Sequence, residues 1–459
     1  MGKTMKKKRR NKRRKQRLVF GTALFLVLLL GSIAFLLFYT LKPERGRSSN
    51  GLAVPAISVV DQKALIENTV FAAKSGMEEK EDEEEPLKIQ PVVMAFGGDI
   101  CFYDEYANMH SLNNRGGSIE SSISSDLLER MRQADIFMLN NEFAYSDRGT
   151  PLADKAFTFR SRPENVSLLS EMGVDIVSIA NNHVYDYGED ALLDTLDILQ
   201  EAGMPYVGAG RNLDEAAAPY YYEVNGRTIA FISATQVERN DTPDTKGATM
   251  VTAGTFRCFN DEEFDRLVRI IREADAKADF TVVYIHWGTE NTDELHWLQT
   301  KQAPLMVEAG ADLIVGDHPH CLQGIEYIKG VPVFYSLGNF WFNSKTLDTG
   351  LLEVTLDEKG ETVCRFLPAI QHDCRTDLIS GEERQRILLY LQCISPDVTI
   401  DEDGYIYDRP YEGPPIPYDE VQRVPPKREE PKPEENPEEQ SPDEQNPEGQ
   451  NPEGQIPQV

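Results

Sequence analysis

The sequence predicts an α/β fold for residues 91–395 of the 459-residue chain, preceded by one membrane-spanning helix. Short apolar runs alternate with stretches of helical periodicity, a pattern typical of βαβ units with buried, mostly parallel strands. Polar residues follow the ends of several of these runs. An uncharged segment near the N-terminus is long enough to cross a bilayer.

The predicted strands and helices alternate along the body of the chain. Strands are expected at residues 92–99, 135–142, 174–181, 228–234, 280–288, 311–317 and 331–340. Helices are expected at residues 124–134, 165–173, 190–203, 261–277 and 296–310. In the first of these helices Leu127, Leu128 and Met131 share one face, as packing against a sheet requires.

The segment Leu18–Leu41 contains 24 residues without a charge. As a helix it would measure roughly 36 Å, which exceeds the hydrocarbon core of roughly 30 Å. Residues 1–17 carry eleven Lys and Arg and no acid, so they are predicted to stay in the cytoplasm. The alternative is a cleaved signal peptide, whose apolar region usually has about 7–15 residues. We therefore expect a single-pass cell-membrane protein with an extracellular C-terminal domain.

Two polar regions flank the predicted body. Residues 42–90 read as an extracellular stalk that ends in the acidic run 78–85. Residues 396–459 read as a disordered tail rich in Pro, Glu and Gln, which closes with four related pentapeptides at 436–455. Such a composition cannot bury enough apolar surface to offset the entropy of the chain.

Charge and cysteine content exclude several function classes. Outside residues 1–17 the chain has 36 basic and 76 acidic residues, so nucleic-acid binding is not expected. The sequence has no P-loop motif, so the chain is not expected to use ATP. Its six cysteines form no CxxC pair, so a zinc site built from cysteine thiolates is not expected. The closest two, Cys364 and Cys374, are candidates for a disulfide outside the cytoplasm.

Polar side chains gather at the predicted strand ends, where open α/β sheets place their ligands. Four histidines are among them, and a purely structural polar network is the alternative to a metal site. Imidazole, carboxylate and amide groups together suit Mn, Fe, Zn or Mg. Pro319 favours an extended His318, which would turn the rings of His318 and His320 to the same side. The strand-end residues are Asp99, Asn140, Glu142, Asn181, Asn182, His183, Asp186, His286, Glu290, His318, His320 and Asn339.

The ordered motifs GGD, NNE, ANNHVYDYG, HWGTE, GDHPHCLQGIE and YSLGNF resemble those of the CapA family of capsule and poly-γ-glutamate synthesis proteins. The resemblance covers residues 91–345 and implies a two-sheet αββα sandwich similar to calcineurin-like metallophosphatases. It implies that Asp99, Glu142, Asn182, His286, His318 and His320 hold a divalent metal ion. By the same resemblance His183 would protonate the leaving group. Asp186 and Glu290 would orient histidines.

The sequence departs from the phosphatase pattern at two motifs. Asp99 is followed by Ile100 and Cys101 in place of a DxH histidine, and the second motif is NNE in place of GDxxD. One metal position therefore has fewer ligands. Two functions stay open. One is a metal-dependent hydrolase or transferase acting on an anionic extracellular polymer. The other is a non-catalytic module that binds the polymer or tethers membrane synthase subunits.

Overall fold

The computed structural model describes residues 89–423, apart from residue 154 and residues 238–245. The predicted cytoplasmic segment 1–17, the membrane helix 18–41, almost all of the stalk and the tail beyond residue 423 lie outside the described residues. Within the part of the chain that is described, no helix is both long and apolar enough to cross a membrane.

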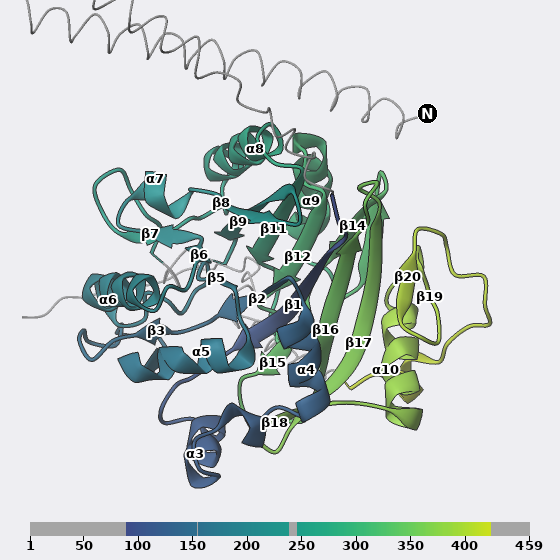
Figure 1. The fold of residues 1–459 in the computed structure, drawn as a ribbon, viewed down its shortest axis with the longest axis horizontal. Coiled ribbons are helices and arrows are strands. Elements are labelled where there is room, and N and C mark those ends of the chain that lie inside the picture. Colours follow the sequence, from purple (N-terminus) through teal and green to yellow (C-terminus); the bar gives the residue numbers. More distant parts are fainter. Residues whose placement is uncertain (1–88, 154, 238–245, 424–459) are drawn as a thin grey trace, which may run out of the picture.

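The larger of the two main sheets has ten strands, and a group of neighbouring strands in it runs parallel (Figure 1). Its strand order is β19 (Thr399–Ile400), β20 (Tyr405–Tyr407), β17 (Thr362–His372), β16 (Leu347–Leu356), β1 (Val92–Ile100), β2 (Ile136–Asn141), β5 (Ile176–Ser178) and β6 (Tyr206–Val207). Beside this path, β15 (Asn339–Trp341) pairs with β1 and β18 (Arg375–Leu378) pairs with β17. The pairs that join β16, β17, β18, β20 and β19 are antiparallel.

The second sheet has six strands with a parallel centre and antiparallel edges. Its order is β13 (Ile325–Ile328), β14 (Val331–Phe334), β12 (Leu313–Asp317), β11 (Phe280–His286), β9 (Arg227–Thr235) and β8 (Tyr220–Val224). Two small sheets complete the strands: β3 (Ala144–Tyr145) with β4 (Arg160–Ser161), and β7 (Ala209–Gly210) with β10 (Gly254–Thr255).

Alternating side chains place one apolar core between the sheets and one outside each sheet. Met94 and Phe96 of β1 meet Val282 and Tyr284 of β11 in the inner core. Outside the first sheet lie α3 (Ala107–Asn114), α4 (Ser125–Gln133), α5 (Ser167–Met172) and α6 (Gly188–Glu201). Outside the second lie α7 (Leu213–Ala216), α8 (Asp261–Asp275) and α9 (Trp297–Ala309). The expected α/β fold with two sheets is therefore confirmed, with helices in the outer layers.

Local sequence explains where these helices begin. In α8 the side chain of Asn260 accepts a hydrogen bond from Glu263 N at 3.0 Å, and the Glu263 carboxylate accepts one from Asn260 N at 3.4 Å. This capping box satisfies two amides that the helix leaves unpaired. Phe264, Leu267 and Ile271 then fall at helical spacing on the face that packs against the second sheet.

The run 331–340, predicted as a single strand, is two strands in different sheets. β14 ends at Phe334 in the second sheet, and β15 begins at Asn339 in the first. Gly338, at φ 68°, makes this crossing, and a Cβ on it would lie 3.0 Å from the carbonyl carbon of Cys321. A Cβ on Gly98 would come within 1.8 Å of Gly338 O. The crossing therefore requires glycine at both positions.

Two other expectations on the fold need correction. The sheets are mixed, not mostly parallel, because the long antiparallel hairpin β16–β17 follows the βαβ region. The body also continues past residue 395 through β19, β20 and α11 (Tyr418–Val421), which follow α10 (Gly381–Cys393), to residue 423. Val398, Ile406 and Val421 are buried in the inner core with α10, and Arg423 pairs with Asp348 at 2.9 Å. Strands of two and three residues are too short to show a periodicity in the sequence.

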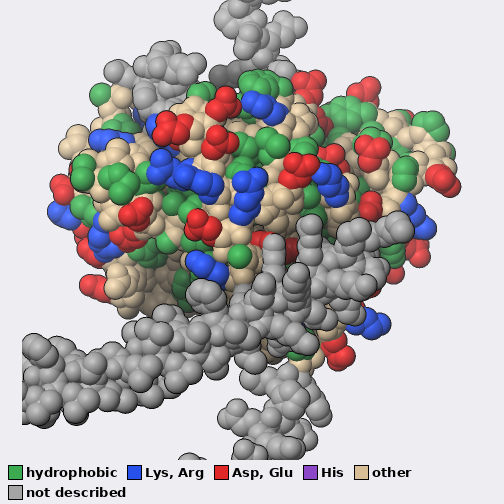
Figure 2. Space-filling model, turned by 90° about the horizontal axis from the view of Figure 1, so that it is seen from above, with side chains coloured by type: hydrophobic (Ala, Val, Ile, Leu, Met, Phe, Trp, Pro, Cys, Tyr) green, Lys and Arg blue, Asp and Glu red, His purple; other side chains and the backbone are tan. Residues whose placement is uncertain are grey.

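All six cysteines are free thiols, so the candidate bridge between Cys364 and Cys374 is not formed. On the face seen in Figure 2, acidic and basic side chains are intermingled.

Candidate metal centre

Most of the predicted site residues meet where the carboxyl ends of the parallel strands of both sheets come together. From the first sheet, Asp99 lies in β1 beside Asn140 of β2 and Asn339 of β15. From the second sheet, His286 ends β11 and lies beside Asp317, which ends β12. The packing of one sheet on the other thus brings together segments that are far apart in the sequence.

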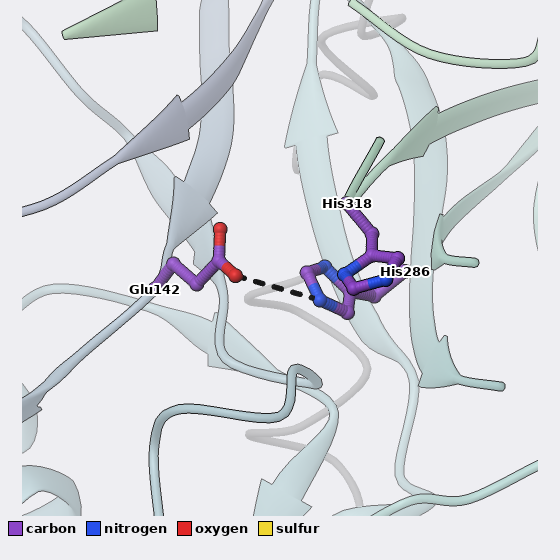
Figure 3. Close-up of side chains that lie close together, drawn as sticks. All are labelled: Glu142, His286 and His318. Atoms are coloured by element: carbon purple, nitrogen blue, oxygen red, sulfur yellow. Dashed lines mark ion pairs between the residues drawn. The ribbon is translucent and has the colours of Figure 1, made fainter. Parts of the chain in front are cut away.

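Glu142 lies at the centre of this cluster. Figure 3 shows its carboxylate directed toward the rings of His286 and His318. Glu142 Oε1 lies 3.6 Å from His286 Nε2 and 3.9 Å from His183 Nε2. Three groups each bring potential ligand atoms within 4.8 Å of one another, which is close enough to share an ion. These groups are Glu142 with His286 and His318, Asp99 with Glu142 and His320, and Asp99 with His286 and Asp317.

The surroundings of His286 test whether the cluster fits a cation. Asp317 Oδ1 lies 3.0 Å from Nδ1, and Asn182 Oδ1 lies 2.9 Å from Nε2. Burial lowers the pKa of His286 to about 3, so the ring is neutral and has only one N–H. The other ring nitrogen keeps a lone pair, which is the donor that a divalent ion requires of an imidazole.

Buried acceptor atoms without partners also favour a cation in the cluster. Within the described residues, Glu142 Oε1, Asp317 Oδ2 and His318 Nδ1 are buried without a hydrogen-bond partner. Leaving such atoms unpaired is costly in a protein interior. Oxygen and imidazole donors together suit a divalent ion, so the residues present fit a metal.

Three carboxyl groups, those of Asp99, Glu142 and Asp317, are fully buried in the cluster. Burial and the charge of Asp99 raise the pKa of Glu142 and of Asp317 well above their usual range. Burial alone would raise the pKa of Asp99, but the hydrogen bond and charge of His320 outweigh it and lower that pKa. A bound cation would stabilise all three carboxylates in the ionised form.

The HPH segment is not extended, although both of its histidines bring a ring nitrogen close to Glu142. His318 and His320 have φ of 95° and 57°, so the extended conformation expected from Pro319 is wrong. His318 packs edge-on against His286, with ring centroids 4.6 Å apart. His320 Nδ1 lies 2.8 Å from Asn339 Oδ1 and 3.4 Å from Asp99 Oδ2.

Tertiary contacts impose this unusual loop. His318 N donates to Asp99 Oδ2 at 3.4 Å, and Asn291 N donates to Pro319 O at 2.8 Å. These bonds override the local preference of the residue before proline, because each fixes the loop to a separate part of the fold.

His183 lies at the edge of the cluster with Asp186 behind it. Its Nδ1 is 2.7 Å from Asp186 Oδ2, and its ring stacks on Phe159 at 4.2 Å. Burial, together with the charge of Lys155, lowers the pKa of His183 well below its usual range. Burial raises the pKa of Asp186 to about 7, although Lys155 opposes the shift. The catalytic roles of His183 and Asp186 stay predictions.

Glu290 does not contact a histidine in the way we expected. Its side chain is exposed and influences His320 only through its charge. Asp317 instead orients His286. Asp317 stands at a predicted strand end, directly before His318, so the same rule could have found it. Lys155, whose Nζ lies 2.6 Å from Asp186 Oδ1, comes from an irregular loop and gave no signal in the sequence.

Cys101 and Cys321 flank the cluster but are buried. Burial raises the pKa of both thiols, so neither forms a reactive thiolate readily.

The profile of a family described as bacterial capsule synthesis protein PGA_cap matches residues 93–344, which is more than half of the chain. The chain belongs to this family. The resemblance read from the six motifs is thereby confirmed, and the cluster from Asp99 to His320 lies within the matched residues.

Two relatives of the chain have names that refer to PGA or capsule biosynthesis. The chain is 36% identical over 225 residues to the "PGA biosynthesis protein CapA" of Bacillus subtilis (strain 168), a match that covers 48% of this chain and 57% of that protein. It is 33% identical over 239 residues to the "Capsule biosynthesis protein CapA" of Bacillus anthracis, covering 51% of this chain and 57% of that protein. The match thus spans little more than half the length of either relative.

Among solved structures, a hypothetical protein from Thermus thermophilus aligns with a TM-score of 0.37 and 18% identity. That alignment covers 61% of this chain and all of the Thermus protein.

Proposed function

We propose that this chain acts in the synthesis or processing of an anionic surface polymer, such as poly-γ-glutamate, through a metal-dependent hydrolase or transferase site. The main support is the buried cluster drawn from both sheets, in which Glu142, Asp317 and His318 present unpaired acceptor atoms. The names of the Bacillus relatives support the polymer class. A membrane anchor at residues 18–41 would hold this site outside the cytoplasm, near membrane synthase subunits.

The ligands of the cluster would be Asp99, Glu142, Asn182, His286, His318 and His320, with Asp317 fixing the ring of His286. A bound Mn, Fe, Zn or Mg ion would lower the pKa of a coordinated water and polarise the scissile group. Its charge would also attract an anionic substrate to a protein whose formal net charge is −29.

His183 is placed to move a proton at the edge of the cluster. Its Nε2 faces Glu142 Oε1, and its Nδ1 is held by Asp186. With Nδ1 held by Asp186, Nε2 is directed into the cluster, where we expect His183 to donate a proton to the leaving group.

The test uses the full-length protein in detergent with added divalent metal and a panel of phosphoesters and γ-glutamyl amides. We expect metal-dependent turnover that His183→Ala lowers by at least about 100-fold. His110→Ala, an exposed histidine in α3, is the control and should keep full activity. Turnover that is absent with every metal, or equal in both variants, would contradict a catalytic site.

One observation favours a second function, a non-catalytic module that binds the polymer or tethers the synthase. Cys101 occupies the position of the missing DxH histidine, and burial raises the pKa of its thiol. One metal position is therefore poor in ligands. If His183→Ala leaves polymer length and yield unchanged in cells, while deletion of residues 91–423 abolishes both, binding alone is sufficient.

A further inference from the structure

Two irregular segments cross beside His183. The first, residues 146–153 and 155–160, lies over the second, residues 182–188. Leu152 N donates to Asp186 O at 2.8 Å, and Phe159 N donates to Asp186 Oδ2 at 2.7 Å. A Cβ on Gly149 would lie 2.1 Å from Tyr187 O, so the backbones are in direct contact. The first segment therefore fixes the second in place.

Lys155 places a largely buried ammonium at this crossing. Its side chain is only 8% exposed, and its Nζ lies 2.6 Å from Asp186 Oδ1. The same ammonium donates to the backbone carbonyl of Asn182. Asp186 Oδ2 meanwhile lies 2.7 Å from His183 Nδ1. One carboxylate thus connects a buried lysine to the proposed proton carrier.

The contact with Asn182 connects Lys155 to the metal ligands as well. The side-chain Oδ1 of Asn182 lies 2.9 Å from His286 Nε2 inside the cluster. A buried charge is stable only when it is paired, so the Lys155 ammonium and the Asp186 carboxylate each require the other. Loss of Lys155 would free Asn182 and leave Asp186 as a buried carboxylate without its cation.

We propose that Lys155 is a positioning residue that fixes His183 through Asp186 and the ligand Asn182 through its backbone carbonyl. This inference rests on the proposed function, because it assigns Lys155 a task at that same site. Lys155 does not act on the substrate itself, since its ammonium is directed at Asp186 and Asn182. We therefore expect Lys155 to affect the rate of turnover and the geometry of the bound metal. It does not contribute directly to substrate affinity.

Lys246 provides a matched control. It is exposed, and its ammonium lies 5.4 Å from the ring of Tyr185 in the same 182–188 segment. Lys246→Met removes a cation beside the same segment without touching Asp186.

The first measurement is binding of Co²⁺ to the full-length protein, followed by its visible absorption. We expect Lys155→Met to bind Co²⁺ about 10- to 100-fold more weakly, with an altered spectrum, because loss of a residue that orients a ligand typically has this effect. Lys246→Met should match the wild type. Lys155→Arg keeps the charge and should retain the wild-type spectrum, which serves as the test if Lys155→Met does not fold.

The second measurement is a double-mutant cycle with Asp186→Asn. If Lys155 acts on His183 through Asp186, the double variant should lose less turnover than the two single losses combined, because only the contact with Asn182 is left to lose. Lys155→Met should lower kcat without raising KM. Additive losses, or wild-type Co²⁺ affinity and spectrum in Lys155→Met, would overturn the proposal. Failure of the wild type to bind Co²⁺ would instead refute the metal site on which the proposed function depends.

Discussion

The two sheets supply different chemistry to the same site. The first sheet provides Asp99, Glu142 and Asn182, which are oxygen ligands, and the second provides His286 and the two histidines that follow β12. Each of the three close groups of ligand atoms takes members from both sheets. Neither sheet alone therefore holds a complete site, and a bound ion would link the sheets at the end of their shared core.

The largest expected effect comes from removing that link. A chelator should lower the unfolding free energy of the metal-loaded protein by about 4 kcal/mol if free metal had stood at roughly 1,000 times its Kd. Chemical denaturation of the full-length protein with and without chelator measures this difference. An identical denaturation midpoint in both conditions would mean that the sheets are not linked by metal.

The next effect concerns how the second sheet orients its imidazoles. Asp317→Asn replaces the carboxylate that lies 3.0 Å from His286 Nδ1. We expect metal affinity to fall by about 10- to 100-fold, as is usual when the partner of a ligating histidine is changed. Asp377→Asn, which alters a partner of His372 away from the cluster, is the control and should keep wild-type affinity in a competition titration. Equal affinities in the two variants would contradict the role of Asp317.

A lower pH should weaken metal binding, because protons compete with the metal for the carboxylates. Burial raises the pKa of Glu142 and Asp317, so both hold protons in the metal-free site over a wider pH range than usual. Metal must displace these protons, and affinity therefore falls as pH falls. Calorimetric titration in two buffers of different ionisation enthalpy reports the protons released, and the absence of any release would be inconsistent with this view.

The smallest expected effect concerns a contact of the C-terminal segment, which should support stability and not metal binding. Tyr418 of α11 donates to Asp293 at 2.7 Å, on the loop whose Asn291 contacts Pro319. Tyr418→Phe should cost about 1 kcal/mol of stability. It should leave metal affinity unchanged, because the contact supports the fold and not a ligand. A loss of metal in this variant would show that the segment shapes the site.

The strand-end rule accounts for most of what could be predicted from the sequence. It placed Asp99, Glu142, Asn182, His183, His286, His318 and His320 together, because parallel strands that alternate with helices end at a common edge. It could not say which partner orients which ring, since Asp317 and Glu290 both follow strands and only the packing distinguishes them.

The remaining features depend on contacts between distant residues. Lys155 lies in an irregular segment without periodicity, and its position follows from the crossing with residues 182–188. The φ values of His318 and His320 are set by bonds to Asp99 and to the loop at Asn291. The boundary at residue 395 was too early because the polar segment after α10 buries only a few apolar side chains, such as Val398 and Ile406.

Metal content of the full-length protein tests the shared site most directly. We expect at least about one divalent ion per chain after loading and gel filtration, which follows from the fit of the buried donor set to a cation. Glu142→Ala combined with His286→Ala removes one ligand from each sheet and should leave almost none, whereas His372→Ala should retain the wild-type amount. Near-zero metal in the wild type, or equal metal in all three proteins, would contradict the account.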